Sequence, residues 1–93
     1  MSKEELLRVI TSYKEYFGYL TIEKEPIAFD VLADCLSQTK LMGHCAYMID
    51  QMEEFVNKGE EEKAHRWLGF IQGCMWTLGR STIDELRELN VGN

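Results

Sequence analysis

The side chains that could do chemistry in this chain are few and scattered. Glu62 and His65 are three residues apart, so on a helix they would share a face, the spacing that carboxylate-bridged di-metal bundles use in pairs. The sequence holds a single copy of this motif, and Glu62 falls in what should be a solvated first helical turn. We therefore interpret Glu62 as stabilising a helix start and predict no metal site.

His44 beside Cys45 suggests a nucleophile with its base, but adjacent residues on a helix do not face each other. The spacing of Cys35, Cys45 and Cys74 matches no zinc pattern, and no glycine-rich phosphate loop follows a strand. We interpret the cysteines as small, buried hydrophobic residues in a reducing compartment. The sequence thus predicts neither catalysis nor a cofactor.

The overall charge limits the possible partners. The 93 residues carry a formal net charge of −6, and the lysines and arginines are scattered singly. This opposes binding to a nucleic-acid backbone, because no basic stripe is present to displace counterions. The N-terminus lacks the apolar run of a signal peptide, and no segment reaches the roughly 20 apolar residues of a membrane span. We expect a cytoplasmic protein without direct nucleic-acid or membrane contacts.

The most apolar stretch must be an element that others enclose. Between Trp67 and Leu78 only Gln72 and Thr77 are neither apolar nor glycine, so a helix there has almost no face suited to water. Its two central glycines would let another backbone approach closely. The chain must wrap this helix or share it with a second copy, so we predict a homo-oligomer, most simply a two-fold dimer. The candidate interface residues are Arg66, Trp67, Gly69, Phe70, Gly73 and Trp76.

Capping boxes mark two helix starts. Ser2 with Glu5 begins a helix near the N-terminus, and Thr82 with Glu85 begins a short one near the C-terminus. In each box the hydroxyl and the carboxylate satisfy amide donors that a helix start leaves exposed. Gly79 precedes the second box and ends the apolar helix.

Between these ends, apolar residues recur at spacings of three and four over residues 28–56, which predicts one long second helix starting at Pro26. Residues 37–40 and Gly43 are the places where this helix would kink or break at little cost. Gly59 supplies a left-handed cap at its end. Helices are therefore expected at about residues 3–17, 26–57, 60–78 and 82–90 of a single domain, 1–93.

These elements predict an all-α fold: an antiparallel hairpin or bundle of three main helices followed by a short C-terminal helix. A cluster of carboxylates surrounds the turn between the second and third helices. It could occupy a basic groove on another protein, although such clusters are usually solvated helix junctions. The candidate acidic patch comprises Asp50, Glu53, Glu54, Glu60, Glu61 and Glu62.

The last third of the chain carries a distinctive pattern. It consists of HRWLGFIQG at residues 65–73, Trp76, and TIDELR at residues 82–87, ending at Asn90. This pattern resembles the C-terminal signature of a group of small, uncharacterised proteins encoded by tailed bacteriophages. The resemblance implies a non-enzymatic phage accessory protein in the host cytoplasm, which binds a host protein and inhibits or redirects it during host takeover or counter-defence.

Two other functions stay open at this point. The first is an oligomer that sequesters nucleotides, holding them between subunits with aromatic and arginine side chains. The second is a metal-dependent enzyme, which would need a second carboxylate and histidine cluster that the sequence does not supply.

Overall fold

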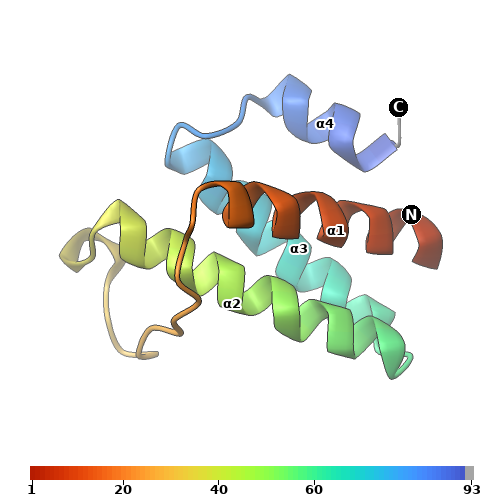
Figure 1. Ribbon diagram of the computed structural model, residues 1–93, viewed down its shortest axis with the longest axis horizontal. Coiled ribbons are helices and arrows are strands. Elements are labelled where there is room, and N and C mark those ends of the chain that lie inside the picture. Colours follow the sequence, from red (N-terminus) through yellow and green to blue (C-terminus); the bar gives the residue numbers. More distant parts are fainter. Residues whose placement is uncertain (92–93) are drawn as a thin grey trace.

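The computed structural model describes residues 1–91 and is built from α-helices joined by turns and one long loop (Figure 1). The helices are α1 (Lys3–Tyr19), α2 (Gln38–Asn57), α3 (Glu61–Thr77) and α4 (Ile83–Val91), with a 3₁₀ turn, η1 (Ala33–Cys35), before α2. No strand occurs among the described residues. The predicted all-α fold, with three main helices and a short C-terminal one, is confirmed.

α2 packs against both α1 and α3, and α4 lies along α1 (Figure 1). Successive helices run antiparallel. The Arg8 guanidinium donates a hydrogen bond to the Leu89 carbonyl oxygen at 2.8 Å, which ties α4 to α1. The side-chain amides of Gln72 and Asn90 exchange two hydrogen bonds, at 2.6 and 3.0 Å. This pair ties α4 to α3 and satisfies the one amide side chain of the apolar stretch.

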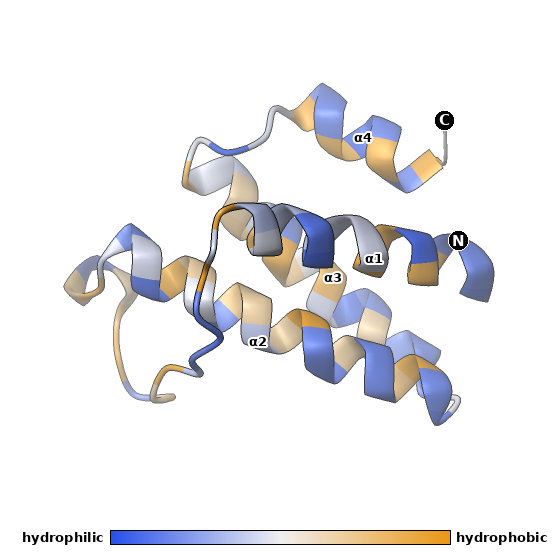
Figure 2. Ribbon diagram, in the orientation of Figure 1, coloured by the Kyte–Doolittle hydropathy of each residue, from blue (hydrophilic) through white to orange (hydrophobic). Residues whose placement is uncertain are grey.

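The core is formed by one stripe of each main helix. Figure 2 shows hydrophobic and hydrophilic bands alternating along the helices, as expected of amphipathic helices that each bury a single face. Methionines contribute several of the central positions, where their flexible side chains fill irregular gaps. The largest fully buried side chains include Leu6, Ile10, Met42, Ile49, Met52, Ile71 and Met75.

Both predicted capping boxes are present. The Ser2 hydroxyl accepts from the Glu5 amide and the Glu5 carboxylate accepts from the Ser2 amide, each at 3.2 Å. Thr82 and Glu85 make the same exchange at 3.1 and 3.0 Å. The glycines predicted to follow the second and third helices also adopt left-handed conformations: Gly59 with φ of 83° and Gly79 with φ of 72°.

The second helix begins at Gln38 and not at Pro26, so the prediction of one long helix is wrong. The Ser37 hydroxyl accepts a hydrogen bond from the Lys40 amide at 3.1 Å and caps the helix there. Residues 20–37, called the long loop below, connect α1 to α2 and include η1. The weak point recognised at residues 37–40 is therefore the true helix start.

The long loop follows from a place near the start of α2, at Gly43, where residues 23–25 cross the helix. The Glu25 amide donates to the Gly43 carbonyl oxygen at 3.1 Å, and the Glu23 carbonyl oxygen lies 2.7 Å from where a Gly43 Cβ would be. In a continuous helix at 1.5 Å per residue, residue 26 would lie about 25 Å from Gly43. The chain must instead turn back over residues 26–37 to reach the start of α2. Gly43, predicted as a possible kink, makes room for this crossing within an unbroken helix.

Several residues assigned to the core by their spacing therefore lie in solvent. Cys35 is exposed on η1, so the interpretation of all three cysteines as buried is wrong for this one. Cys45 is buried and Cys74 is half-buried.

Within residues 1–91, none of the helices combines the length and the apolar character that a membrane crossing requires.

His44 anchors the long loop, and this anchor should weaken in acid. Its Nδ1 accepts a hydrogen bond from the Ile27 amide at 3.1 Å, and burial lowers the pKa of His44 below its usual value. The unfolded chain binds a proton at an ordinary pKa of about 6.5, so the stability contributed by neutral His44 is complete above that pH and falls below it.

We expect the melting temperature of the wild-type chain to fall more steeply between pH 7 and pH 5 than that of the His44→Gln variant, which cannot titrate there. Thermal melts followed by circular dichroism across this range test the prediction. Parallel curves for the two proteins would contradict it.

Candidate functional site

α3 turns one face to the core and leaves the opposite face uncovered by this chain. The core face carries residues three or four apart, all buried: Ala64, Leu68, Ile71 and Met75. The opposite face is exposed through the middle of the helix. Within one chain, the predicted enclosure of this apolar helix is therefore achieved on one side only.

A shallow apolar groove of about 520 Å³ runs along the uncovered face and is called the α3 groove below. Phe70 and Trp76, 54% and 57% exposed, line it together with Gly69 and Gly73. A Cβ added at either glycine would meet nothing within 4 Å, so these glycines make no close contact inside this chain. The remaining lining residues come from η1, α2 and the end of α3: Ala33, Leu41, Cys74, Thr77 and Leu78.

The structure separates two predicted interface residues from the four that line the α3 groove. The Trp67 ring turns toward α2 and meets the Phe55 ring edge-on, with centroids 4.8 Å apart. The Lys63 ammonium lies 4.4 Å from the Phe55 ring centroid, a cation–π contact on the same cluster. Arg66 is exposed and lies in a shallow hollow with its neighbours at the start of α3: Gly59, Glu60, Glu61, Glu62 and Lys63.

The predicted acidic patch divides into two parts. Lys14 pairs with Glu53 and Lys24 pairs with Asp50, both at 2.7 Å between nitrogen and oxygen. These pairs are partly exposed and each contributes little to stability, but they neutralise Asp50 and Glu53. The glutamates around the α2–α3 turn form the other part: Glu54, Glu60, Glu61 and Glu62.

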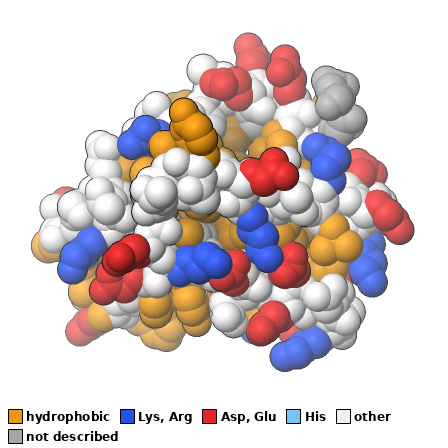
Figure 3. Space-filling model, viewed as in Figure 1, with side chains coloured by type: hydrophobic (Ala, Val, Ile, Leu, Met, Phe, Trp, Pro, Cys, Tyr) orange, Lys and Arg blue, Asp and Glu red, His pale blue; other side chains and the backbone are white. Residues whose placement is uncertain are grey.

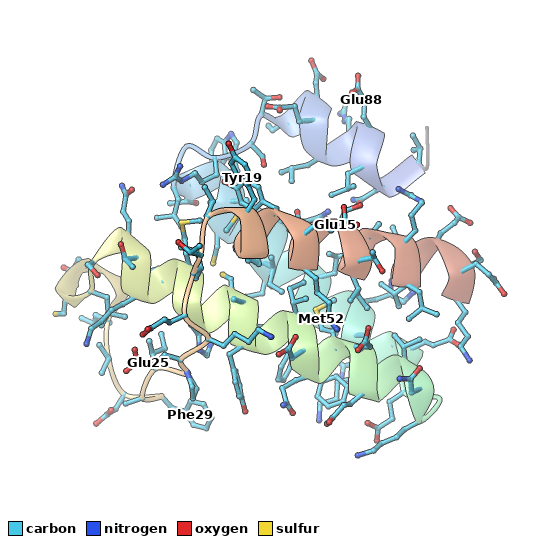
Figure 4. The ribbon with its side chains drawn as sticks, viewed as in Figure 1. Glu15, Tyr19, Glu25, Phe29, Met52 and Glu88 are labelled. Carbon is cyan, nitrogen blue, oxygen red and sulfur yellow. The ribbon has the colours of Figure 1, made fainter. Side chains whose placement is uncertain are left out.

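A second uncovered apolar surface lies on the long loop, and sequence reasoning missed it. Phe29 is fully exposed and Leu32 is 72% exposed. In Figure 4 the Phe29 ring points away from the helices, and Figure 3 shows hydrophobic side chains gathered at the lower left, where Figure 1 places the loop. The three-and-four spacing of Ala28, Val31 and Cys35 predicts a helix over this segment. Pro26 and Ser37, which flank it, were the signals for a loop.

Cys35 is the exposed thiol at these surfaces, and Cys74 is a half-buried one. Cys74 lines the α3 groove, and a hydrogen bond with the buried Cys45 thiol lowers the pKa of Cys74 to about 7 while raising that of Cys45. A thiol that is half-exposed and partly ionised near neutral pH is open to alkylation or oxidation. Cys74 can therefore carry a label in the groove once the exposed Cys35 has been replaced.

In the part of the chain that the structure describes, no three His, Cys, Asp or Glu side chains converge as metal ligands would. Glu62 is exposed and His65 is half-buried near the start of α3. No protein-family model, curated protein or solved structure matches this chain. The features of this chain that could bind a partner are its two uncovered apolar surfaces, the α3 groove and the long loop.

Proposed function

We propose that this chain is a non-enzymatic phage accessory protein that binds a host protein in the host cytoplasm and inhibits or redirects it. The observation that carries the proposal is the long loop, which presents Phe29 and Leu32 to solvent. Small size, a net charge of −6 and the resemblance of the last third of the chain to a phage group support it.

The long loop has the properties of a binding segment. Most connections in compact domains have about 4–6 residues, and much longer ones usually carry function. This loop is fixed to α2 at two adjacent points, through Glu25 at Gly43 and through Ile27 at His44. Because these anchors already order the loop, less conformational entropy is lost when it binds a partner. Phe29 and Leu32 thus project from a base that is already ordered.

The nucleotide-sequestering alternative has less support. The lining of the α3 groove is almost entirely apolar, whereas phosphate groups need cationic side chains or clustered amide donors. Arg66, the residue expected to hold a phosphate, lies outside the groove among glutamates. The exposed apolar side chains of the long loop fit an apolar protein surface better than they fit an anion.

Replacing both loop side chains with serine should abolish host-protein binding without unfolding the chain. Hot-spot residues typically contribute about 2 kcal/mol or more, so the Phe29→Ser, Leu32→Ser double variant should recover at least about tenfold less partner. Affinity capture from a lysate of the host bacterium, quantified by mass spectrometry, measures this for tagged wild-type and variant chains.

Tyr19→Ser provides the matched control, because Tyr19 is 87% exposed yet lies at the end of α1. This variant should capture the same partner as the wild type. Equal recovery by the double loop variant would contradict the proposal. So would a melting temperature that rises with a nucleotide fraction while no protein is captured.

A further inference from the structure

We propose that two copies of this chain pair through their α3 grooves, with the two α3 helices antiparallel and Gly69 of each copy opposite Gly73 of the other. This inference goes beyond the proposed host binding, which uses the long loop. It assigns the occupant of the α3 groove as a second copy of the same chain.

The uncovered face of α3 has the composition of a packing face at its centre and of a solvated face only at its ends. The exposed residues along it recur at spacings of four and three, by which one helix packs along another. The central positions hold two glycines and a tryptophan where a solvated face would carry charges. In chain order the α3 residues of this stripe are Glu62, Arg66, Gly69, Gly73 and Trp76, with the exposed Phe70 and Thr77 beside it; Arg80 follows the left-handed Gly79 and lies past the helix end.

Gly69 and Gly73 lower the stability of the α3 helix, and no close contact within one chain compensates for this loss. Each glycine in a helix interior costs about 1 kcal/mol relative to alanine. At Gly43 that cost permits a backbone crossing, but at Gly69 and Gly73 the space above the backbone is empty. A second helix laid over these two positions could approach closely, as glycine-lined helix contacts allow, and would cover Phe70 and Trp76.

The same face is complementary to itself when reversed. In an antiparallel two-fold pair centred on residue 71, each residue faces the one equally far from the centre in the other copy. Arg66 then faces Trp76 of the second copy, a stacking and cation–π arrangement. Glu62 then lies toward the end of the second copy's α3, near Arg80, which lines a hollow with Trp76, Asp84 and Glu85.

A parallel pair has the opposite electrostatics. It would place each residue beside its own counterpart, so that the glutamates at the start of α3 would repel each other and the two Arg66 side chains would meet. The antiparallel orientation is therefore favoured, because it keeps the acidic starts of the two α3 helices apart.

The first test is the oligomeric state. Sedimentation equilibrium of the wild-type chain should give twice the 10.8 kDa mass of one chain. Gly69→Leu should raise the dimer dissociation constant at least about tenfold, because its side chain would separate the paired helices. The isolated Gly69→Leu chain should melt no lower than a monomeric wild-type chain, since the site is open within one chain and leucine favours a helix.

The second test is charge reversal, which a defect in folding cannot imitate. Glu62→Arg and Arg80→Glu should each raise the dissociation constant about tenfold, because the charges at positions 62 and 80 of the two copies then repel each other. The double variant should restore wild-type pairing. A monomeric wild-type chain at high micromolar concentration, a dimer that Gly69→Leu leaves intact, or a double variant that fails to recover would each overturn the proposal. None of these results depends on capture of a host protein.

Discussion

Ile71→Ala should lower the free energy of unfolding by about 3 kcal/mol, a large part of the stability of a domain this small. Ile71 is fully buried on the core face of α3. Removing its outer methyl and methylene groups leaves a cavity that the surrounding helices can close only partly. At roughly 4–8 °C per kcal/mol, the melting temperature should fall by about 15 °C. Urea titration followed by circular dichroism gives the free energy directly.

The adjacent substitution, Phe70→Ala, is the matched control. This substitution removes a larger side chain, but Phe70 is 54% exposed in the α3 groove. In a monomeric chain it should therefore lower the free energy of unfolding by less than about 1 kcal/mol. Both variants must be measured at a concentration where the wild type does not associate. Similar losses at the two positions would mean that α3 is buried on both sides within one chain.

Gly43→Ala should also destabilise the protein, by about 2 kcal/mol, although alanine is the better helix former. The added Cβ would lie 2.7 Å from the Glu23 carbonyl oxygen, closer than such atoms can approach. Because that atom belongs to the backbone, the whole crossing must shift, and the hydrogen bond from the Glu25 amide to Gly43 weakens with it. The same urea titration measures the loss.

Gly18→Ala tests whether this loss comes from the crossing. Gly18 is helical and a Cβ there would meet nothing within 4 Å, so alanine should leave stability unchanged or raise it by up to about 1 kcal/mol. If Gly43→Ala also left stability unchanged or raised it, residues 23–25 of the long loop could not pack against α2 as closely as the structure indicates.

The features that the sequence predicted correctly are those that local chemistry decides. Ser2 and Thr82 each find their glutamate three residues away, and Gly59 and Gly79 take left-handed conformations that few other residues tolerate. These signals need no distant partner. They were enough to locate the ends of α1, α3 and α4 within a few residues, and with them the all-α fold.

The start of α2 could not be predicted in the same way, because a distant contact decides it. Three-and-four spacing continues through Ala28, Val31 and Cys35, yet these residues are exposed on the long loop. The chain is held instead where Glu25 meets Gly43, a pairing that no periodicity reveals. The error hid Phe29 and Leu32, which the spacing placed in a helix and the structure places in solvent.

The sequence predicted only part of the candidate site. An apolar helix must pack against other elements, but its composition does not show which of its faces packs within the same chain. Gly69, Phe70, Gly73 and Trp76 do lie together in the α3 groove. Trp67 was grouped with them by its chemistry, whereas its position on the helix brings it to Phe55.

The attachment of α4 has a consequence for how the molecule opens. No residue of α4 is fully buried; the partly buried Leu89 packs against the core, and the hydrogen bond from Arg8 to Leu89 and the amide pair between Gln72 and Asn90 add two polar links. Helices held by so few contacts open at a fraction of the global unfolding free energy, with the remaining elements intact. We therefore expect α4 to detach from α1 and α3 while the three main helices stay folded.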